Sequence, residues 1–180
     1  MNGVRDAIWF RGRHEARHAV LAVFLGRKVK HIRPCNPDED CTARTQLWPD
    51  KGISGQPYMN WNYEIKALGT KHLRIQRHLM IRLAGMVGRF SNEGDELFAD
   101  DERDVVGVLS VICANDAIRS SYRKYLEECV REILGRPAVV QAVEEVGTQI
   151  EKFLRINTIL DGKELTARIR VLLARQDHGP

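Results

Sequence analysis

The sequence predicts a mainly α-helical domain, a helical array with a small two-stranded β-ribbon. Long segments carry apolar residues at the three- and four-residue spacing of helices, whereas residues 29–33 alternate apolar and basic side chains as a half-buried strand does. The chain has 180 residues, of which 43% are hydrophobic. This length and composition suit a single domain, residues 1–180, built around one hydrophobic core.

The first predicted elements are a helix and a ribbon. The helix is expected over residues 5–25, because its apolar pattern continues to that point and Gly26 is a natural stop. A strand follows at residues 29–33 and ends at Pro34, and a second short strand is expected at residues 42–48 after an acidic turn. The ribbon would lie next to the helix and offer an edge to a peptide substrate.

Four further helical segments follow a predicted loop. The loop covers residues 49–62, and the helical segments cover residues 63–90, 100–134, 138–155 and 161–175. The segment at residues 100–134 could contain a break. His72 falls on the apolar stripe of the first of these helices, where a hydrogen-bonded core histidine is favoured over a ligand. The basic opposite face suits a solvated surface as well as a nucleic-acid patch, and we favour the solvated surface.

The first helix contains the pentad His14-Glu15-Ala16-Arg17-His18, an H-E-x-x-H pattern. At about 100° per residue, His14 and His18 project about 40° apart and one turn along the helix, so both imidazoles can bind one zinc ion. Glu15 projects about 100° from His14, within reach of a water bound to that metal. Glu15 is therefore the predicted general base of a peptide hydrolysis in which zinc also polarises the carbonyl group.

A catalytic zinc site commonly has three protein ligands and an open fourth position. No third histidine follows the pentad at the spacing of a metzincin, so an acidic residue from a distant helix is expected. Asp100, Asp101 and Glu102 are explained by the preference for acidic residues in the first turn of a helix. Asp104 lies beside the apolar stripe of that helix, where a carboxylate needs a partner, and is predicted as the third zinc ligand.

Net charge and cysteine content exclude few functional classes of protein. The formal net charge of +4 suits a soluble enzyme or weak attraction to polyanions. The four cysteines form no C-x-x-C pair and no signal peptide is evident, so reduced thiols in a cytoplasmic protein are expected. A structural metal on His31, Cys35 and Cys41 is disfavoured by their irregular spacing. No apolar run is long enough to cross a bilayer, so no membrane contact is expected.

Five segments match, in order, the motifs of a known zinc protease family. Residues 14–20 match an H-E-A-G-H-A-[VL] helix, and residues 42–49 resemble a G-x-T-x-x-x-P strand. Residues 83–85 resemble the start of an L-G-G-R-A-A-E helix, residues 102–104 fall at an S-N-D motif, and residues 158–165 resemble a T-L-x-G-E-E-[IL] segment. Together these segments resemble the peptidase domain of the FtsH family over nearly the whole chain.

The resemblance implies a mainly helical fold with a small β-ribbon, zinc ligands at His14, His18 and Asp104, and water activation by Glu15. Family members form hexameric rings, so it also implies a homo-oligomer. The sequence contains no G-x-x-x-x-G-K-[ST] phosphate loop. We therefore expect an ATP-independent zinc metalloendopeptidase that acts on peptides or unfolded proteins, unless a separate ATPase partner delivers folded substrates.

One departure from the family motif supports an alternative. Arg17 replaces the family's glycine, and its guanidinium could bind a substrate carboxylate, pair with a nearby acid or disfavour the cation. The second hypothesis is therefore a catalytically impaired FtsH-like module that binds a protein or, as the less favoured partner, a nucleic acid. Glu15 argues against this alternative, since a structural zinc site has no use for a base beside an open coordination position.

Overall fold

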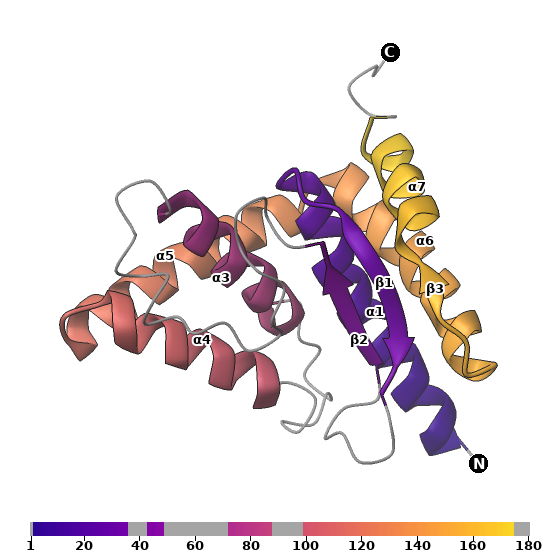
Figure 1. Cartoon of the computed structure of the whole chain (residues 1–180), viewed down its shortest axis with the longest axis horizontal. Helices are drawn as coiled ribbons and strands as arrows, with labels where there is room; N and C mark the ends of the chain where they lie inside the picture. Colours follow the sequence, from indigo (N-terminus) through magenta and orange to yellow (C-terminus); the bar gives the residue numbers. More distant parts are fainter. Residues whose placement is uncertain (1, 36–42, 49–71, 88–98, 175–180) are drawn as a thin grey trace.

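A computed structural model of the chain describes residues 2–35, 43–48, 72–87 and 99–174 (Figure 1). The described elements are α1 (Asn2–Phe24), β1 (Val29–Pro34), β2 (Ala43–Leu47), α3 (His72–Val87), α4 (Ala99–Ile112), α5 (Asp116–Leu134), α6 (Pro137–Arg155), β3 (Leu160–Asp161) and α7 (Gly162–Ala174). They confirm the mainly helical class. No helix in these ranges is long and apolar enough to span a membrane. The loop predicted at residues 49–62 and the start of the helix predicted at residues 63–90 lie outside the described residues.

α1 is the central element of the described fold. It contacts α6, α3 and α7 as well as β1 and β2. Ala16, Ala19 and Leu21 are fully buried although they project from α1 in three different directions. A helix that is apolar around much of its circumference is stable only inside a core. The predicted stop is confirmed, because α1 ends before Gly26, whose φ of 82° favours glycine.

β1 is the middle strand of an antiparallel three-stranded sheet in the order β2-β1-β3. Ile32 pairs with Thr45 on one side and with Leu160 on the other. The prediction of a two-stranded ribbon was therefore one strand short, because β3 has two residues, too few to show an alternating pattern. The start of α7 lies directly against β1, since a Cβ at Gly162 would overlap the Lys30 carbonyl group.

The remaining helices form two groups around α1. α6 and α7 pack on one side, next to the sheet, and α3, α4 and α5 pack on the other (Figure 1). The break allowed for within residues 100–134 falls between α4 and α5. Asn115 caps the new helix there, because its Oδ1 accepts the Ile118 N–H at 3.0 Å.

The cysteines differ in their chemical state. Cys113 and Cys129 are free thiols. Cys35, directly after β1, is part of a disulfide bond, so the prediction of reduced thiols is wrong for this residue. Sequence spacing could not reveal this, because a disulfide requires two Cβ atoms about 3.5–4.5 Å apart in the folded chain. Cys41 lies outside the described residues.

α1 and α6 approach each other closely at two glycines. A Cβ at Gly12 would lie 2.8 Å from the carbonyl oxygen of Gly147. The neighbouring Arg13 is buried in the same interface and pairs with Glu144 at 3.1 Å and Glu151 at 3.2 Å. The backbones therefore pack without an intervening side chain at Gly12, while Arg13 connects the two helices by charge.

We expect Gly12→Ala to lower the free energy of unfolding by about 1–3 kcal/mol, because the added methyl group overpacks against backbone that cannot move aside. Gly107 is the matched control, since it lies within α4 and nothing is within 4 Å of a Cβ added there. Gly107→Ala should raise the free energy of unfolding by about 0.5–1 kcal/mol. Urea denaturation followed by circular dichroism measures both values. Equal effects of the two substitutions would contradict the close α1–α6 contact.

Candidate metal centre

Three side chains of α1 and α4 each bring one ligand atom to the same buried point. The Nε2 atoms of His14 and His18 are 3.0 Å apart. Asp101 Oδ2 lies 3.2 Å from the first and 2.9 Å from the second. Within the described ranges, these residues form the one group of His, Cys, Asp and Glu that could hold a metal ion. Ligands about 2.0–2.1 Å from a tetrahedral zinc ion lie about 3.4 Å from one another, so the triangle fits one face of such a site after small movements.

The hydrogen bond of His18 determines which ring nitrogen faces this point. His18 Nδ1 lies 2.6 Å from the Ile81 carbonyl oxygen, which can only accept, so Nδ1 carries the hydrogen. In the neutral ring, Nε2 then presents a lone pair toward His14 and Asp101, as a metal ligand does. In the absence of a metal, a proton on Nε2 would supply the positive charge beside Asp101. Burial opposes the charged ring, but the Asp101 carboxylate raises the pKa of His18.

The Asp101 carboxylate is held at both oxygens. Its Oδ1 accepts a hydrogen bond from Arg82 Nη1 at 3.0 Å, which turns Oδ2 toward the histidines. Burial alone would raise the pKa of Asp101, but the adjacent imidazoles of His18 and His14 keep the pKa well below its ordinary value. Asp101 is therefore an anion in a buried position, where it requires positive charge beside it.

Asp104, the predicted third ligand, lies one turn further along α4 and has other partners. Its Oδ2 is 3.0 Å from His78 Nε2 and 2.7 Å from Arg82 Nε. Arg82 thus connects the two carboxylates, and the structure brings Asp101 rather than Asp104 to the histidine pair. Asp104 acts on the centre through Arg82, whose guanidinium it helps to orient.

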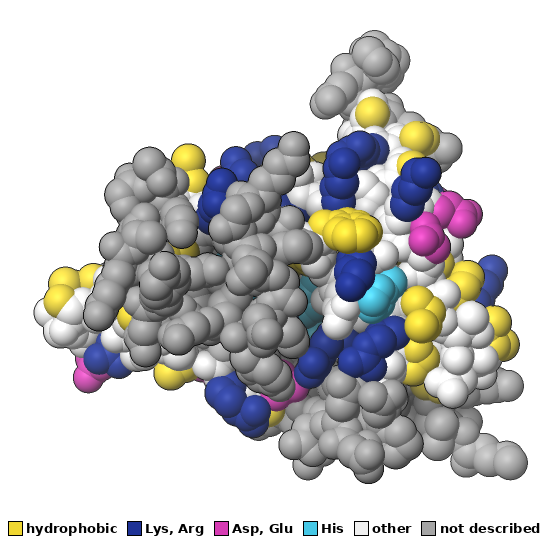
Figure 2. Space-filling view, viewed as in Figure 1, with side chains coloured by type: hydrophobic (Ala, Val, Ile, Leu, Met, Phe, Trp, Pro, Cys, Tyr) yellow, Lys and Arg dark blue, Asp and Glu magenta, His cyan; other side chains and the backbone are white. Residues whose placement is uncertain are grey.

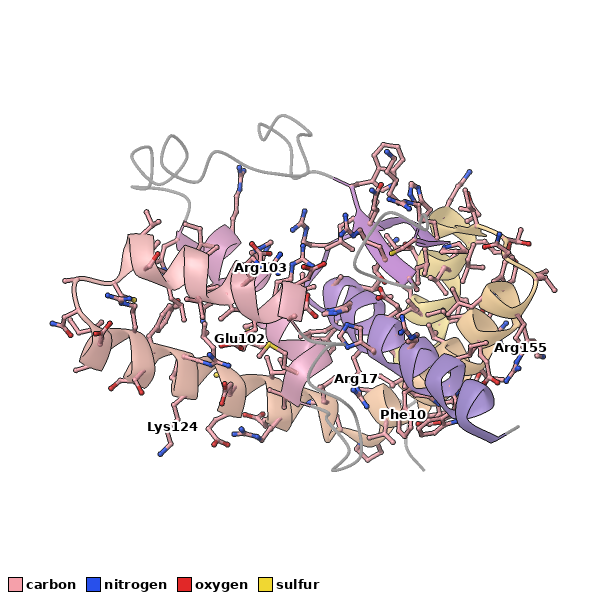
Figure 3. The ribbon with its side chains drawn as sticks, turned by 90° about the horizontal axis from the view of Figure 1, so that it is seen from below. Phe10, Arg17, Glu102, Arg103, Lys124 and Arg155 are labelled. Atoms are coloured by element: carbon pink, nitrogen blue, oxygen red, sulfur yellow. The ribbon has the colours of Figure 1, made fainter. Side chains whose placement is uncertain are left out.

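The acidic first turn of α4 distributes its side chains over different faces. Glu102 accepts a hydrogen bond from Arg123 of α5 at 2.6 Å, and Arg103 has 75% of its side chain exposed (Figure 3). Asp101 lies four residues before Val105, which is fully buried, and therefore faces the core. The spacing between Asp101 and Val105 was visible in the sequence. However, the general preference for acidic residues in the first turn of a helix explained Asp100, Asp101 and Glu102 equally well.

α3 approaches the histidine pair at Gly85, the last residue of the segment 83–85 that resembles the start of the family's L-G-G-R-A-A-E helix. A Cβ there would lie 2.7 Å from His18 Nε2 and 2.8 Å from His14 Nδ1, so only a hydrogen atom fits. Arg17, marked in Figure 3 on α1, binds the same segment, because its Nη1 donates to the Gly85 carbonyl at 3.2 Å. The residue that departs from the family motif thus joins α1 to α3 next to the centre.

Glu15 connects the centre to the sheet. Its Oε2 accepts the backbone N–H of Thr45 in β2 at 2.6 Å, and Thr45 Oγ1 donates to the Glu15 carbonyl oxygen at 3.3 Å. Burial opposes the charged form of His18, whereas the charges of Asp101 and Glu15 both raise its pKa, so the Glu15 carboxylate acts electrostatically on a ligand residue. The Thr45 bond uses one oxygen and leaves Oε1 out of that contact.

His72 lies away from the centre and is exposed. Its ring contacts that of Tyr122 at a centroid distance of 6.2 Å. The interpretation of His72 as a core histidine is therefore wrong. His72 begins α3, and the stripe of α3 enters the core only at Ile75, so helical spacing alone overestimated how far the buried part extends.

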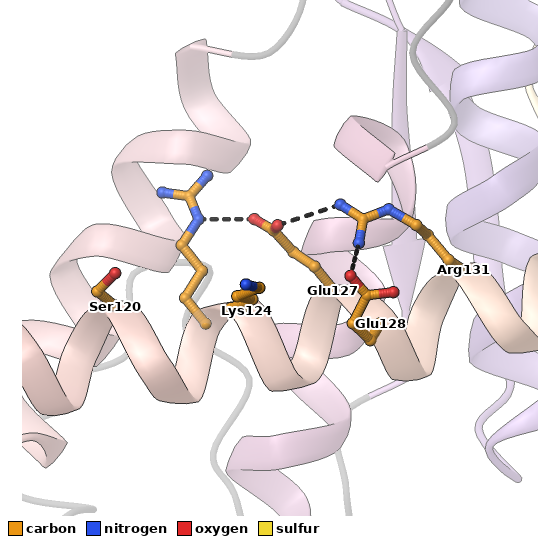
Figure 4. A pocket seen from close by; sticks show the side chains of 6 residues that line it. Ser120, Lys124, Glu127, Glu128 and Arg131 are labelled. Carbon is orange, nitrogen blue, oxygen red and sulfur yellow. Dashed lines mark hydrogen bonds and ion pairs between the residues drawn. The ribbon is translucent and has the colours of Figure 1, made fainter.

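A shallow hollow on α5 offers no comparable chemistry (Figure 4). It is lined by Ser120, Arg123, Lys124, Glu127, Glu128 and Arg131. Its arginines and glutamates pair with one another, for example Arg123 Nε with Glu127 Oε1 at 2.8 Å. Pairs three or four residues apart on a partly exposed helix are typical of a solvated helix face.

A scan of the chain against protein-family models, a search of curated proteins and a search of solved structures find no match. The resemblance to the FtsH peptidase domain therefore stays a prediction, and any function has to be inferred from the geometry of the centre.

We expect the chain to bind zinc, and Asp101→Asn to weaken zinc binding more than Asp104→Asn does. The first substitution removes a ligand charge, whereas the second acts through Arg82, and changes outside the ligand set typically cost about 10–100-fold in affinity. Competition with a chromogenic chelator measures the dissociation constants. The reverse order of the two variants would make Asp104 the third ligand.

Gly85→Ala should also abolish zinc binding, because its methyl group would displace both imidazoles. Thermal unfolding followed by circular dichroism is measured in parallel, so that a failure to fold is distinguished from a local effect. Gly107→Ala, which adds a methyl group in open space, serves as the control. Zinc affinity equal to that of the unmodified chain in Gly85→Ala would contradict the described contact.

Proposed function

We propose that the chain is a zinc-dependent metalloendopeptidase that hydrolyses peptide bonds without ATP. The observation that carries the proposal is the buried triangle of His14 Nε2, His18 Nε2 and Asp101 Oδ2. Catalytic zinc sites use three protein ligands of these types and keep one position open. These three residues would hold the ion, with Asp101 in the place for which Asp104 was predicted.

The residues around the triangle have roles that suit hydrolysis. A zinc ion held there would supply a Lewis acid, which lowers the pKa of water and polarises a carbonyl group. Glu15 would accept a proton from the attacking water and pass it to the leaving amine. The Thr45 N–H holds Glu15 in place, the Ile81 carbonyl orients His18, and Arg82 orients Asp101.

The proposed substrates are extended peptides or unfolded segments of proteins. The support for this class is the position of β2, a strand at the edge of the described sheet that contacts the proposed base. The resemblance to the FtsH family adds two further proposals. One is assembly into a homo-oligomer, hexameric in that family, and the other is a separate ATPase partner for folded substrates.

A module that binds a protein without cleaving it is the second candidate. It is favoured by the hydrogen bond between Glu15 and Thr45, because a carboxylate engaged at 2.6 Å already has a structural role. The contact of Arg17 with the Gly85 carbonyl is compatible with either function.

Glu15→Gln separates the two candidates. Glutamine keeps an oxygen that can accept the Thr45 N–H but cannot take up a proton, so zinc binding should persist while hydrolysis falls by about 10²–10⁴-fold. A mixture of internally quenched peptides serves as substrate, and zinc is quantified in the same samples. Equal rates in both proteins would remove Glu15 from the mechanism. A zinc-loaded, unmodified chain that cleaves none of the peptides would favour the binding module.

A further inference from the structure

β2 lies at one edge of the described sheet and beside the metal centre. The strand order is β2-β1-β3, and Thr45 of β2 donates its backbone N–H to Glu15. An extended peptide that adds to a sheet edge has its side chains next to those of the edge strand. The partly exposed side chains of β2 would therefore contact such a peptide.

Alternation along β2 separates its side chains into two sets. Thr45 faces α1, since its hydroxyl bonds to the Glu15 carbonyl oxygen, so Arg44 faces the opposite side. Arg33 of β1 is directly across from Arg44. Together with Lys30 of β1 these arginines are named the basic face, and Figure 2 shows Lys and Arg side chains gathered over the two strands.

The basic face places like charges side by side. Arg33 and Arg44 occupy directly opposite positions on adjacent strands, an arrangement that is destabilising for like charges. Arg44 reaches outward to Asp100 of α4, with 3.7 Å between Nη2 and Oδ2. Burial lowers the pKa of the adjacent His31, and the charges of Lys30 and Arg33 lower it further. Basic side chains of the described strands therefore neighbour one another on this face.

We propose that the centre selects extended peptides that carry an acidic side chain opposite Arg44. This inference rests on the proposed peptidase function and names the substrate class of that site. A substrate carboxylate beside Arg44, on the side away from Arg33, would pair with the Arg44 guanidinium, whose ion pair with Asp100 spans 3.7 Å. Because Asp100 directly precedes the ligand residue Asp101, Arg44 lies next to the metal centre, and the acidic side chain is close to the bond that is cleaved.

An acidic peptide explains the basic face better than a nucleic acid does. Binding to a phosphate backbone uses cations along a track that follows several nucleotides, whereas this face ends at the metal centre, where Arg44 meets Asp100. The exposed ring of Trp48, a stacking platform for a base among the described residues, already has the Lys30 ammonium 5.8 Å from its centre.

Fluorescent peptides in which each position in turn carries Glu, Gln or Lys test the inference. Binding is measured by fluorescence anisotropy with zinc-loaded Glu15→Gln protein, so that the readout does not depend on cleavage. The best Glu peptide should bind about tenfold more tightly than its Lys counterpart, and Arg44→Glu should reverse that order. Arg103→Glu is the matched control, because Arg103 also pairs with Asp100, at 3.1 Å, but lies on α4. The Arg103→Glu protein should still bind the Glu peptide more tightly than the Lys peptide.

An unchanged order of peptides in a folded Arg44→Glu protein would overturn the inference. So would an oligothymidylate that binds more tightly than the Glu peptide and displaces it, since the partner of the face would then be a nucleic acid. If binding depends on peptide charge but the zinc-loaded, unsubstituted chain cleaves none of the peptides, the peptidase function is refuted and acidic peptides are supported as the ligand. Cleavage with no preference for charge would support the peptidase and overturn the inferred preference.

Discussion

The contact between the buried Asp101 carboxylate and the imidazoles of α1 determines how three helices meet. A carboxylate with 5% exposure is stable as an anion only where donors and positive charge surround it. α1 supplies two imidazoles and α3 supplies Arg82, so one charge on α4 fixes the relative position of all three elements. The same contact explains the glycine at position 85, because α3 can reach the histidine rings only where it has no side chain.

Local sequence rules predicted what depends on neighbouring residues, but not what depends on packing. The central helix with its H-E-x-x-H pentad, the stop at Gly26 and the paired strands all follow from spacing over a few residues. The choice between Asp101 and Asp104 does not, because the two project only about 60° apart on α4 and the packing of α4 decides which meets α1. β3 was missed for a related reason, since its pairing with β1 joins segments more than a hundred residues apart.

The proposed base and the proposed ligands belong to one connected framework. Glu15 is tied to β2 through Thr45, β2 pairs with β1, and the Val29 N–H of β1 donates to Thr166 of α7 at 3.1 Å. α7 and α6 then pack against α1, which carries the pentad. A displacement of the sheet edge would therefore move Glu15 relative to His14 and His18. Such coupling would keep the proposed general base in register with the proposed metal ligands.

The hydrogen bonds that orient His18 and Asp101, two of the proposed metal ligands, come from protein groups and do not depend on a metal. His18 donates from Nδ1 to the Ile81 carbonyl, so its Nε2 must carry either a proton or a metal to satisfy Asp101. Exchange of the proton for zinc leaves the hydrogen bonds of Ile81 and Arg82 in place. Small zinc domains fold only with their ion, whereas here α1 is buried in an extensive apolar core that requires none. A zinc ion that the fold does not need, held by the three proposed ligand atoms, would be available for chemistry.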